Sequence, residues 1–356
     1  MQQEFFTGNR ERLAELLDNG SVAIFLSGLP QRRAGDQYYH FEVDRNFFYL
    51  TGLKEPNLGM LISKKDTFIE STLLLPPVNE RMERSNGSTL RPEDVTKTSG
   101  IANVLYGSID QRVLEILASG SGRSYSVAYL DFFVNPGWDN PQMVALAGSI
   151  RSGCPYARIK NANPLVNGLR FIKQPEEVAA IRQAIALTDK GLQNALRHLS
   201  DGRPEYEVRL DFEDPIFRTN EGLGFTSIVA AAKNSTTLHH EPGASLCHSG
   251  DMVLFDVGAH VEFYSADISR TYPISGKFSV RQRQIYEIVL QMQYECIAMM
   301  KSGAGFKDVE DTCRGVAVRE MIKAGIIADE DEATKHYYHG CCHPLGLFTH
   351  DVHAQT

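Results

Sequence analysis

The sequence has no run of basic residues, and this absence limits the partners it could bind. Its 356 residues include 36 lysines and arginines against 44 aspartates and glutamates, a formal net charge of −8 at pH 7. Surfaces that bind nucleic acid or anionic membranes usually present clustered positive charge to phosphate groups. We therefore expect neither nucleic acid nor a membrane as a partner.

Long apolar runs and paired cysteines are missing as well. A membrane-spanning helix needs about 20 predominantly apolar residues, and no stretch approaches that length. The first residues lack the basic segment and apolar core of a secretory signal. The six cysteines do not show the paired spacing of a disulfide framework or a zinc knuckle. Together these absences predict a reduced, cytoplasmic protein.

One pair of cysteines leaves an alternative open. Cys341 and Cys342 are adjacent and immediately precede His343, so these side chains could bind a soft metal. Packing in the hydrophobic core is the interpretation that we favour for them.

Apolar residues make up 42% of the chain and charged residues 22%, as in ordinary globular proteins. The length favours two domains, which we place at 1–163 and 164–356. Strands alternate with helices, so we expect an α/β (α+β) fold. The predicted strands are 21–26, 60–63, 68–75 and 225–232; the predicted helices are 109–117, 142–151, 205–218 (broken at Pro215), 309–324, and those beginning at Asn9, Pro175 and Ser279.

The helix that begins at Ser279 carries apolar residues at helical spacing, and this pattern is typical of a core-facing stripe. Methionines in such a stripe usually fill a core, so we assign them no cofactor role. The stripe consists of Ile285, Ile288, Val289, Met292, Cys296, Met299 and Met300.

Two aspartates mark the most informative stretch, from Asp251 to Pro273. Asp256 ends an apolar strand pattern, Asp267 follows eleven residues later in a second one, and residues 258–261 could form the turn between them. Antiparallel pairing would bring the two carboxylates together. Because two buried carboxylates repel each other, one must be protonated or a metal ion must lie between them. The alternative is an ordinary structural aspartate that pairs with Arg270 or caps a turn.

Histidines concentrate in the second half of the chain, where nine of the eleven fall between His239 and His353. This clustering beside two unusual aspartates favours a functional site. His339 and His343 stand four residues apart, but Gly340 and Pro344 argue against a helix there, so we expect loop or extended chain.

Four segments carry a resemblance to a known family. They are 41–52, the stretch Phe171-Ile-Lys-Gln-Pro-Glu-Glu, the pair Asp256-Val-Gly and Ala266-Asp-Ile-Ser-Arg-Thr, and His339-Gly-x-x-His343-Pro-Leu-Gly-x-x-x-His350-Asp351. In this order they resemble the aminopeptidase P and prolidase family of dinuclear metallopeptidases. The resemblance implies an N-terminal aminopeptidase P-like domain followed by a catalytic domain of the pita-bread fold.

The resemblance also implies specific roles. Asp256 would hold one metal ion, Asp267 would bridge two, and His343 would bind the second, while His239, His339 and His350 would contact substrate or shuttle protons. The expected cofactors are two divalent ions, most consistent with Mn²⁺, with Co²⁺ or Zn²⁺ as alternatives. The expected reaction is hydrolysis of an N-terminal Xaa-Pro bond by a metal-bridging hydroxide, and the expected assembly is a homo-oligomer. The remaining histidines His240, His248, His260, His336 and His353 match no family role, so we expect them to be surface or packing residues.

The family's two remaining ligands are glutamates downstream of the histidine block, and these 356 residues do not reach them. We therefore expect a C-terminally incomplete pita-bread domain, lacking its last strands, with impaired activity. Two alternatives remain: an Xaa-Pro dipeptidase (prolidase), or a non-catalytic peptide-binding module of the same fold.

Overall fold

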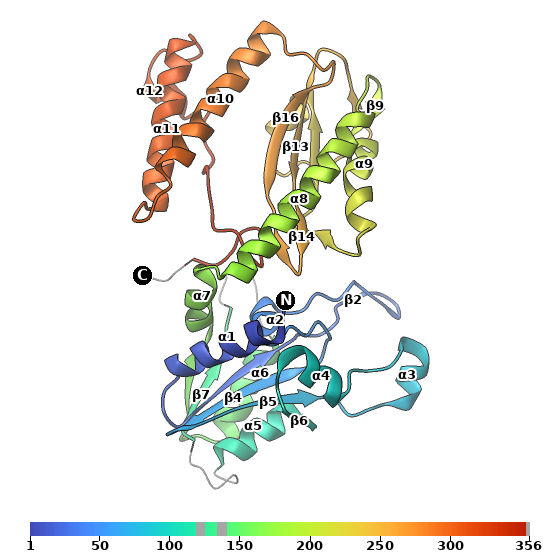
Figure 1. Ribbon diagram of the computed structural model, residues 1–356, viewed down its shortest axis with the longest axis vertical. Coiled ribbons are helices and arrows are strands. Elements are labelled where there is room, and N and C mark those ends of the chain that lie inside the picture. Colours follow the sequence, from blue (N-terminus) through green and yellow to red (C-terminus); the bar gives the residue numbers. More distant parts are fainter. Residues whose placement is uncertain (119–124, 134–140, 354–356) are drawn as a thin grey trace. The chain divides into compact units, whose positions relative to one another are not determined.

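The computed structural model describes residues 1–118, 125–133 and 141–353, which form two compact units. One unit comprises Met1–Glu176 with His353, and the other comprises Glu177–Val352. Both contain helices and strands, which confirms the α/β (α+β) prediction (Figure 1). The predicted division between residues 163 and 164 falls at the start of α7 (Asn163–Phe171) and stays a prediction about domain limits.

A six-stranded mixed sheet forms the centre of the first unit, in the order β6-β5-β4-β1-β7-β8. The strands are β1 (Ser21–Leu26), β4 (Gly59–Lys65), β5 (Phe68–Leu75), β6 (Asn103–Tyr106), β7 (Val127–Leu130) and β8 (Arg158–Asn161). Strand β1 pairs antiparallel with β4 and parallel with β7. All six residues of β1 are buried, as expected for a central strand that is covered on both faces.

Helices cover both faces of this sheet. On one side α1 packs against α2, α4 and α7; on the other, α5 and α6 pack on Val22, Ile24 and Leu61 of the sheet (Figure 1). The remaining elements of the unit are peripheral, namely the β2–β3 hairpin and α3. The bounds are α1 (Gln3–Leu16), α2 (Arg45–Thr51), α3 (Glu80–Asn86), α4 (Pro92–Ser99), α5 (Ile109–Leu117), α6 (Pro141–Gly153), β2 (Arg32–Ala34) and β3 (Gln37–Tyr38).

The prediction that a helix begins at Asn9 is wrong. Helix α1 begins at Gln3, and Asn9 lies buried inside it. Its side-chain Nδ2 donates a 2.8 Å hydrogen bond to the carbonyl oxygen of Tyr49 in α2. A tertiary contact therefore satisfies the amide that we had expected to cap the helix.

Asp44 anchors the start of α2, within the segment that resembles the family's N-terminal domain. Its carboxylate accepts 2.9 Å hydrogen bonds from the backbone N–H groups of Asn46 and Phe47. We predict that Asp44→Ala lowers the free energy of unfolding by about 1–2 kcal/mol, because two N–H groups lose their cap. Urea unfolding followed by circular dichroism measures this loss, with the exposed Asp36→Ala as a matched control. Equal stability of both variants would contradict the assigned capping role.

The second unit contains a three-stranded antiparallel sheet, in the order β11-β13-β16. Its core joins apolar residues of this sheet, such as Val229 and Phe255, to α8 and α9 through Leu192 and Phe212. The bounds are α8 (Pro175–His198), β9 (Arg203–Pro204), α9 (Glu205–Phe217), β10 (Gly222–Leu223), β11 (Ile228–Ala231), η1 (Ala232–Thr236), β12 (Leu246–Cys247), β13 (Met252–Val257), β14 (Ala259–Val261), β15 (Tyr264–Ser265) and β16 (Ile268–Pro273). Helix α9 continues through Pro215, contrary to the predicted break. Because Pro215 has no N–H, it cannot bond the carbonyl oxygen of Asp211, which instead accepts a 2.7 Å hydrogen bond from Asn194 Nδ2.

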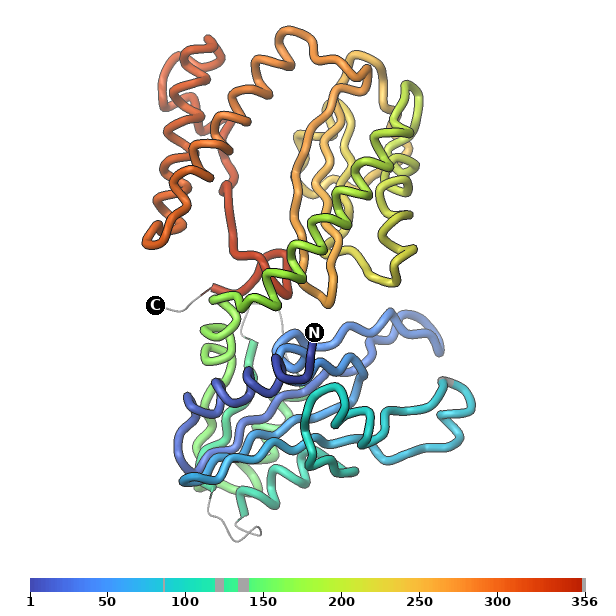
Figure 2. The backbone as a smooth tube through the Cα atoms, viewed as in Figure 1, coloured from blue at the N-terminus to red at the C-terminus, as the bar shows by residue number. Residues whose placement is uncertain are grey.

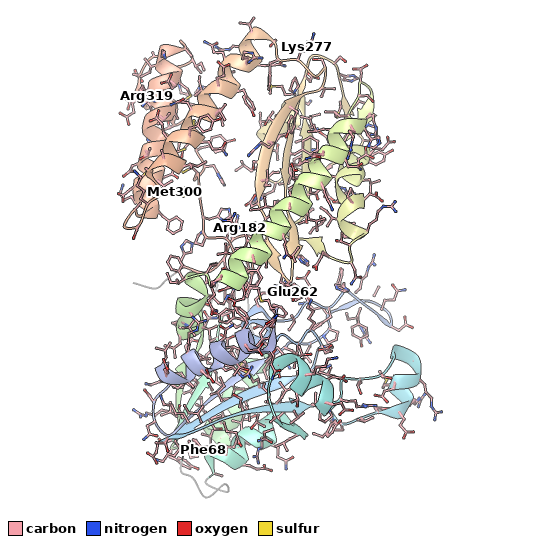
Figure 3. All side chains as sticks on the ribbon, in the orientation of Figure 1. Phe68, Arg182, Glu262, Lys277, Met300 and Arg319 are labelled. Carbon is pink, nitrogen blue, oxygen red and sulfur yellow. The ribbon has the colours of Figure 1, made fainter. Side chains whose placement is uncertain are left out.

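Two longer helices, α10 (Val280–Met299) and α11 (Phe306–Lys323), follow and pack against each other, before the short α12 (Glu330–Ala333). Ser279 caps α10 in a capping box with Gln282, as predicted. The predicted core stripe is confirmed in part: Ile288 and Cys296 are buried, and Met292 and Met299 pack half-buried against the same clusters. Val289 is 57% exposed, and Ile285 and Met300 are exposed too (Met300 is labelled in Figure 3). Helix α11 covers one side of α10, and the remaining apolar residues line a pocket.

None of the helices within the described ranges is both long enough and apolar enough to cross a bilayer.

Candidate metal centre

Strands β13 and β16 bring the two aspartates of the central stretch to one end of the sheet. They pair antiparallel, with Asp256 opposite Ser269 and Val257 opposite Ile268, and Asp267 immediately precedes β16. The Ser269 hydroxyl donates a 2.8 Å hydrogen bond to Asp256 Oδ1. The predicted antiparallel pairing of the two aspartate segments is therefore confirmed.

The turn between these strands is not where we predicted it. Residues 259–261 continue as β14, which pairs with β15, and the chain reverses at Glu262 and Phe263 (Glu262 is labelled in Figure 3). Both turn residues have positive φ, 52° and 65°. Ala259 and Val261 suit a strand better than a turn, so the hairpin extends beyond the aspartates instead of ending beside them.

Gly258 permits a close approach of the backbone between the two aspartates. A Cβ at this position would lie 1.9 Å from the carbonyl oxygen of Ala266, the residue before Asp267. We predict that Gly258→Ala costs about 1–3 kcal/mol of stability and weakens Mn²⁺ binding, because the backbone beside Asp267 must shift. Calorimetric Mn²⁺ titration measures the weakening. Gly315→Ala, at a site with open space on α11, is the matched control; unchanged Mn²⁺ affinity in Gly258→Ala would contradict the prediction.

The histidine segment reaches the aspartates from the end of the described chain. After α12 the backbone runs in loop and extended conformation toward β15, as Gly340 and Pro344 predicted (Figure 2). Ser265 N–H donates to the carbonyl oxygen of Gly346 at 2.9 Å, which holds this segment beside β15. Thr349 Oγ1 donates to the carbonyl oxygen of Gly224 at 3.2 Å.

This anchoring places one imidazole directly on the second aspartate. His343 Nε2 lies 3.1 Å from Asp267 Oδ2. The ring of His350 packs edge-on against that of His343, with 4.2 Å between the ring centroids. Asp267 and His343, which are far apart in the sequence, therefore meet at the end of β13 and β16, with the His350 ring beside them.

The surroundings of Asp267 disfavour the negative charge of its carboxylate. Burial raises the pKa of Asp267 above its usual value, and the negative charge of Asp256 raises it further; His343 acts in the opposite direction without cancelling the rise. Arg270 does not neutralise either carboxylate in the described structure: its side chain is exposed and donates to the carbonyl oxygen of Ser269. The ion-pair alternative is therefore not what the structure shows.

The chemistry of the three side chains suits a divalent cation, although their ligand atoms do not all lie within 4.8 Å of one another in the described structure. Asp256, Asp267 and His343 supply carboxylate oxygens and one imidazole nitrogen, a donor set that suits Mn²⁺, Co²⁺ or Zn²⁺. A cation between the carboxylates would remove the repulsion that now raises the pKa of Asp267.

The three predicted catalytic histidines differ in their contacts with the Asp267–His343 pair. His239 lies in an exposed turn after η1, and the contacts of the described residues do not connect it with the aspartates. His339 is exposed, with Nδ1 2.7 Å from the carbonyl oxygen of Gly340. Of the three, His350 alone has a described contact with the Asp267–His343 pair.

Two polar features escaped the sequence reasoning. Glu205 is fully buried, and His240, which we had expected at the surface or in packing, lies with Nε2 2.8 Å from its Oε2. Cys341 is exposed, so the core-packing prediction for it is wrong, and Cys342 is only half-buried. Cys341 instead lies against Cys296 and Cys313. The adjacency of Cys341 and Cys342 had left soft-metal binding open, but no local pattern relates Cys341 to Cys296 and Cys313, or Glu205 to His240, because packing of separate elements creates both features.

Both parts of the chain match families of known proteins. Residues 179–356 match metallopeptidase family M24, and residues 6–125 match the N-terminal domain of aminopeptidase P.

Similar proteins extend the match over nearly the whole chain. The Xaa-Pro aminopeptidases of Haemophilus influenzae and Escherichia coli are 28% and 27% identical, over 99% of this chain and 81% and 82% of theirs. A solved structure of a Bacillus anthracis protein assigned to aminopeptidase P superposes with a TM-score of 0.95 at 35% identity, covering 99% of this chain and 84% of that one. Zinc-substituted E. coli aminopeptidase P in complex with product superposes with a TM-score of 0.89 at 26% identity, over 99% and 82%.

Proposed function

The chain belongs to the aminopeptidase P family of the M24 metallopeptidases, and we propose that it hydrolyses the bond between an N-terminal residue and a following proline. Its two parts correspond to the family's N-terminal domain and pita-bread domain. The observation that carries the proposal is the convergence of Asp256, Asp267 and His343 at the end of β13 and β16.

We propose that these three residues hold divalent cations, with Mn²⁺ as the preferred ion. When bound, such cations acidify a water molecule and polarise the scissile carbonyl. Ser269 donates a hydrogen bond to Asp256, and Asp267 lies at hydrogen-bonding distance from His343; both contacts support these assignments. Two carboxylates and one imidazole offer fewer donors than two such ions normally hold, so water or further carboxylates would complete the coordination.

The histidines supply proton transfer and substrate contact in this proposal. His350 packs on His343 and is therefore close enough to the site to hold a proton beside the reacting carbonyl. His239 and His339 are assigned to substrate contact because they match the family's histidines in order. Proline at the second position has no N–H and a fixed φ, so its recognition must rely on shape more than on backbone pairing.

The test is cleavage of a tripeptide Xaa-Pro-Xaa by the metal-free protein with and without added Mn²⁺. Whatever cleavage occurs, at the impaired rate expected for a site with few metal donors, should require Mn²⁺, should stop with chelator, and should be absent when alanine replaces proline. Cleavage that persists in chelator would contradict a metal-dependent reaction.

Two further results would replace the proposal by a related one. Cleavage confined to Xaa-Pro dipeptides would identify a prolidase. Mn²⁺ and peptide binding without any cleavage would identify a non-catalytic peptide-binding protein.

We also propose a cytoplasmic location and a homo-oligomeric assembly. The first is supported by six free cysteines, four of them buried in the structure; sedimentation analysis would test the second.

A further inference from the structure

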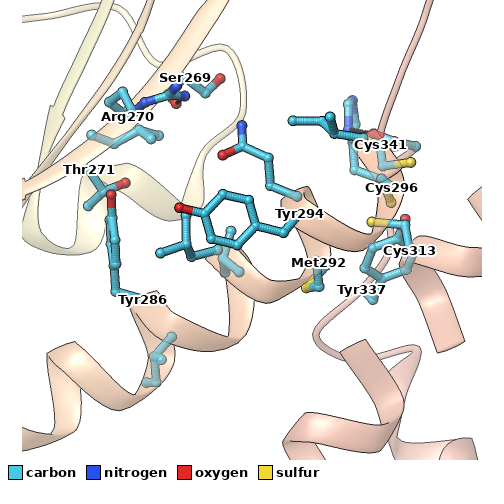
Figure 4. Close-up of a pocket in the computed structure, with 18 of the residues that line it drawn as sticks. Ser269, Arg270, Thr271, Tyr286, Met292, Tyr294, Cys296, Cys313, Tyr337 and Cys341 are labelled. Carbon is cyan, nitrogen blue, oxygen red and sulfur yellow. Dashed lines mark hydrogen bonds between the residues drawn. The ribbon is translucent and has the colours of Figure 1, made fainter. Parts of the chain in front are cut away.

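Three cysteines from separate elements converge in the second unit. Cys296 comes from α10, Cys313 from α11 and Cys341 from the loop before His343, and their Sγ atoms all lie within 4.8 Å of one another. Figure 4 shows the three thiols close together, beside Tyr337. In the described part of the chain this is the group of side chains that comes closest to a preformed metal site.

The spacing of the sulfur atoms suits a single ion. In a tetrahedral zinc site with Zn–S distances of about 2.3 Å, neighbouring sulfur atoms lie ~3.8 Å apart. Sulfur atoms already within 4.8 Å of one another need to approach by no more than about 1 Å. Rotation of the side chains about χ1 and small shifts of the loop suffice for that.

Ordinary core packing does not explain the whole arrangement. Cys296 and Cys313 are buried with Val309 in a small apolar cluster, as packing residues would be. Cys341 is exposed, yet its loop is held against this cluster. Glu310 on α11 accepts hydrogen bonds from Cys341 N–H at 2.8 Å and from the Tyr337 hydroxyl at 2.7 Å. An acidic side chain therefore fixes the loop that supplies the third thiol.

The exposed side chain of Cys341 brings one edge of the cluster to the surface of the described residues. The cluster forms part of the wall of a pocket of about 900 Å³, together with Tyr337 and His339 (Figure 4). The fourth coordination position would face this pocket, where water can enter. Cys342 also packs against the same cluster.

We propose that Cys296, Cys313 and Cys341 form a thiolate site for a thiophilic cation of the Zn²⁺ type, separate from the Asp256–Asp267–His343 centre. Soft thiolates favour such ions more strongly than the carboxylate-rich centre does, for which Mn²⁺ is the preferred ion. An ion at the thiolates would tie α10 and α11 to the loop that continues into His343. This site does not depend on the proposed peptidase activity.

Cobalt titration of the reduced, metal-free protein tests the proposal. Thiolate-bound Co²⁺ gives an intense near-ultraviolet charge-transfer band, which a carboxylate and imidazole site does not give. We expect one equivalent of Co²⁺ to produce the band and Zn²⁺ to abolish it by displacement. Absence of the band in the unmodified protein would overturn the proposal.

Matched variants locate the site. Cys341→Ser changes an exposed side chain, so it should leave the fold intact while weakening Co²⁺ binding by more than about 100-fold. Cys313→Ser should do the same. Cys247→Ser, at a buried thiol in β12, and Asp267→Asn, at the other centre, should keep the band. A band that survives in both Cys341→Ser and Cys313→Ser would contradict the assigned ligands.

Discussion

Asp267→Asn should abolish Mn²⁺-dependent cleavage of an Xaa-Pro peptide and lower Mn²⁺ affinity by at least about 100-fold. The amide keeps the shape of the side chain but removes the charge, and a neutral amide cannot bridge two cations as a carboxylate can. Asp267 Oδ2 lies 3.1 Å from His343 Nε2, and the pKa of this carboxyl is raised by burial and by the charge of Asp256. Calorimetric titration and a peptide-cleavage assay measure the two effects.

The control for this variant is Asp251→Asn, at the opposite end of β13. It changes charge by the same amount in the same part of the fold, so a general electrostatic effect would appear in both variants. Intact cleavage by Asp267→Asn, or an equal reduction in Asp267→Asn and Asp251→Asn, would contradict the assignment of Asp267 to the metal centre.

Glu205→Gln should lower the free energy of unfolding by about 3–5 kcal/mol. Glu205 is fully buried. Its carboxylate accepts hydrogen bonds from the backbone N–H groups of Ala231 and Gly243 and from the Asn234 amide, and it lies 2.8 Å from Nε2 of the His240 ring. A glutamine turns one acceptor oxygen into a donor, so buried donors face each other without an acceptor. Chemical unfolding at pH 7 measures the loss.

The pH dependence of stability gives an independent check on Glu205. Burial alone would raise the pKa of this carboxyl, but its hydrogen bonds outweigh burial, and the net pKa lies below the usual 4.5. A depressed pKa means that the unfolded state takes up the proton first, so this stabilisation is complete above about pH 4.5 and is lost as the pH falls below it. We expect Glu205→Gln to lack this part of the acid-induced destabilisation.

The matched control is Glu207→Ala, which removes a half-exposed carboxylate from the same helix. Its partner is Arg203, and exposed pairs of this kind contribute at most about 1 kcal/mol. Equal losses of stability at positions 205 and 207 would contradict the structural importance of the buried network.

Local patterns predicted those parts of the fold that depend on neighbouring residues. The helices that begin near Pro175 and Ser279 and the antiparallel pairing around Asp256 were predicted from periodicity, caps and β-forming runs. Asn9 was misread because its hydrogen-bond partner, Tyr49, lies on another helix. Ile285, Val289 and Met300 of the α10 stripe were wrongly assigned to the core, because amphipathic spacing shows which face is apolar but not what covers it.

Local sequence patterns predicted only part of the candidate site. The pairing of the aspartate segments follows from strand patterns, whereas the approach of His343 to Asp267 came from the family resemblance, since local spacing does not relate residues so far apart. The thiol cluster joins two helices and a loop. The adjacent Cys341 and Cys342 left soft-metal binding open from the sequence, but the participation of Cys296 and Cys313 depends on tertiary packing and has no metal-binding spacing along the chain.

Diffraction from crystals soaked in Mn²⁺, recorded for anomalous scattering, would locate the bound ions without reference to catalysis. We predict anomalous density within about 2.5 Å of carboxylate oxygens of Asp256 and Asp267, and of the His343 ring, with the thiol cluster empty of Mn²⁺. Density confined to the thiols, or a guanidinium filling the space between the two aspartates, would contradict a metal centre at the end of β13 and β16.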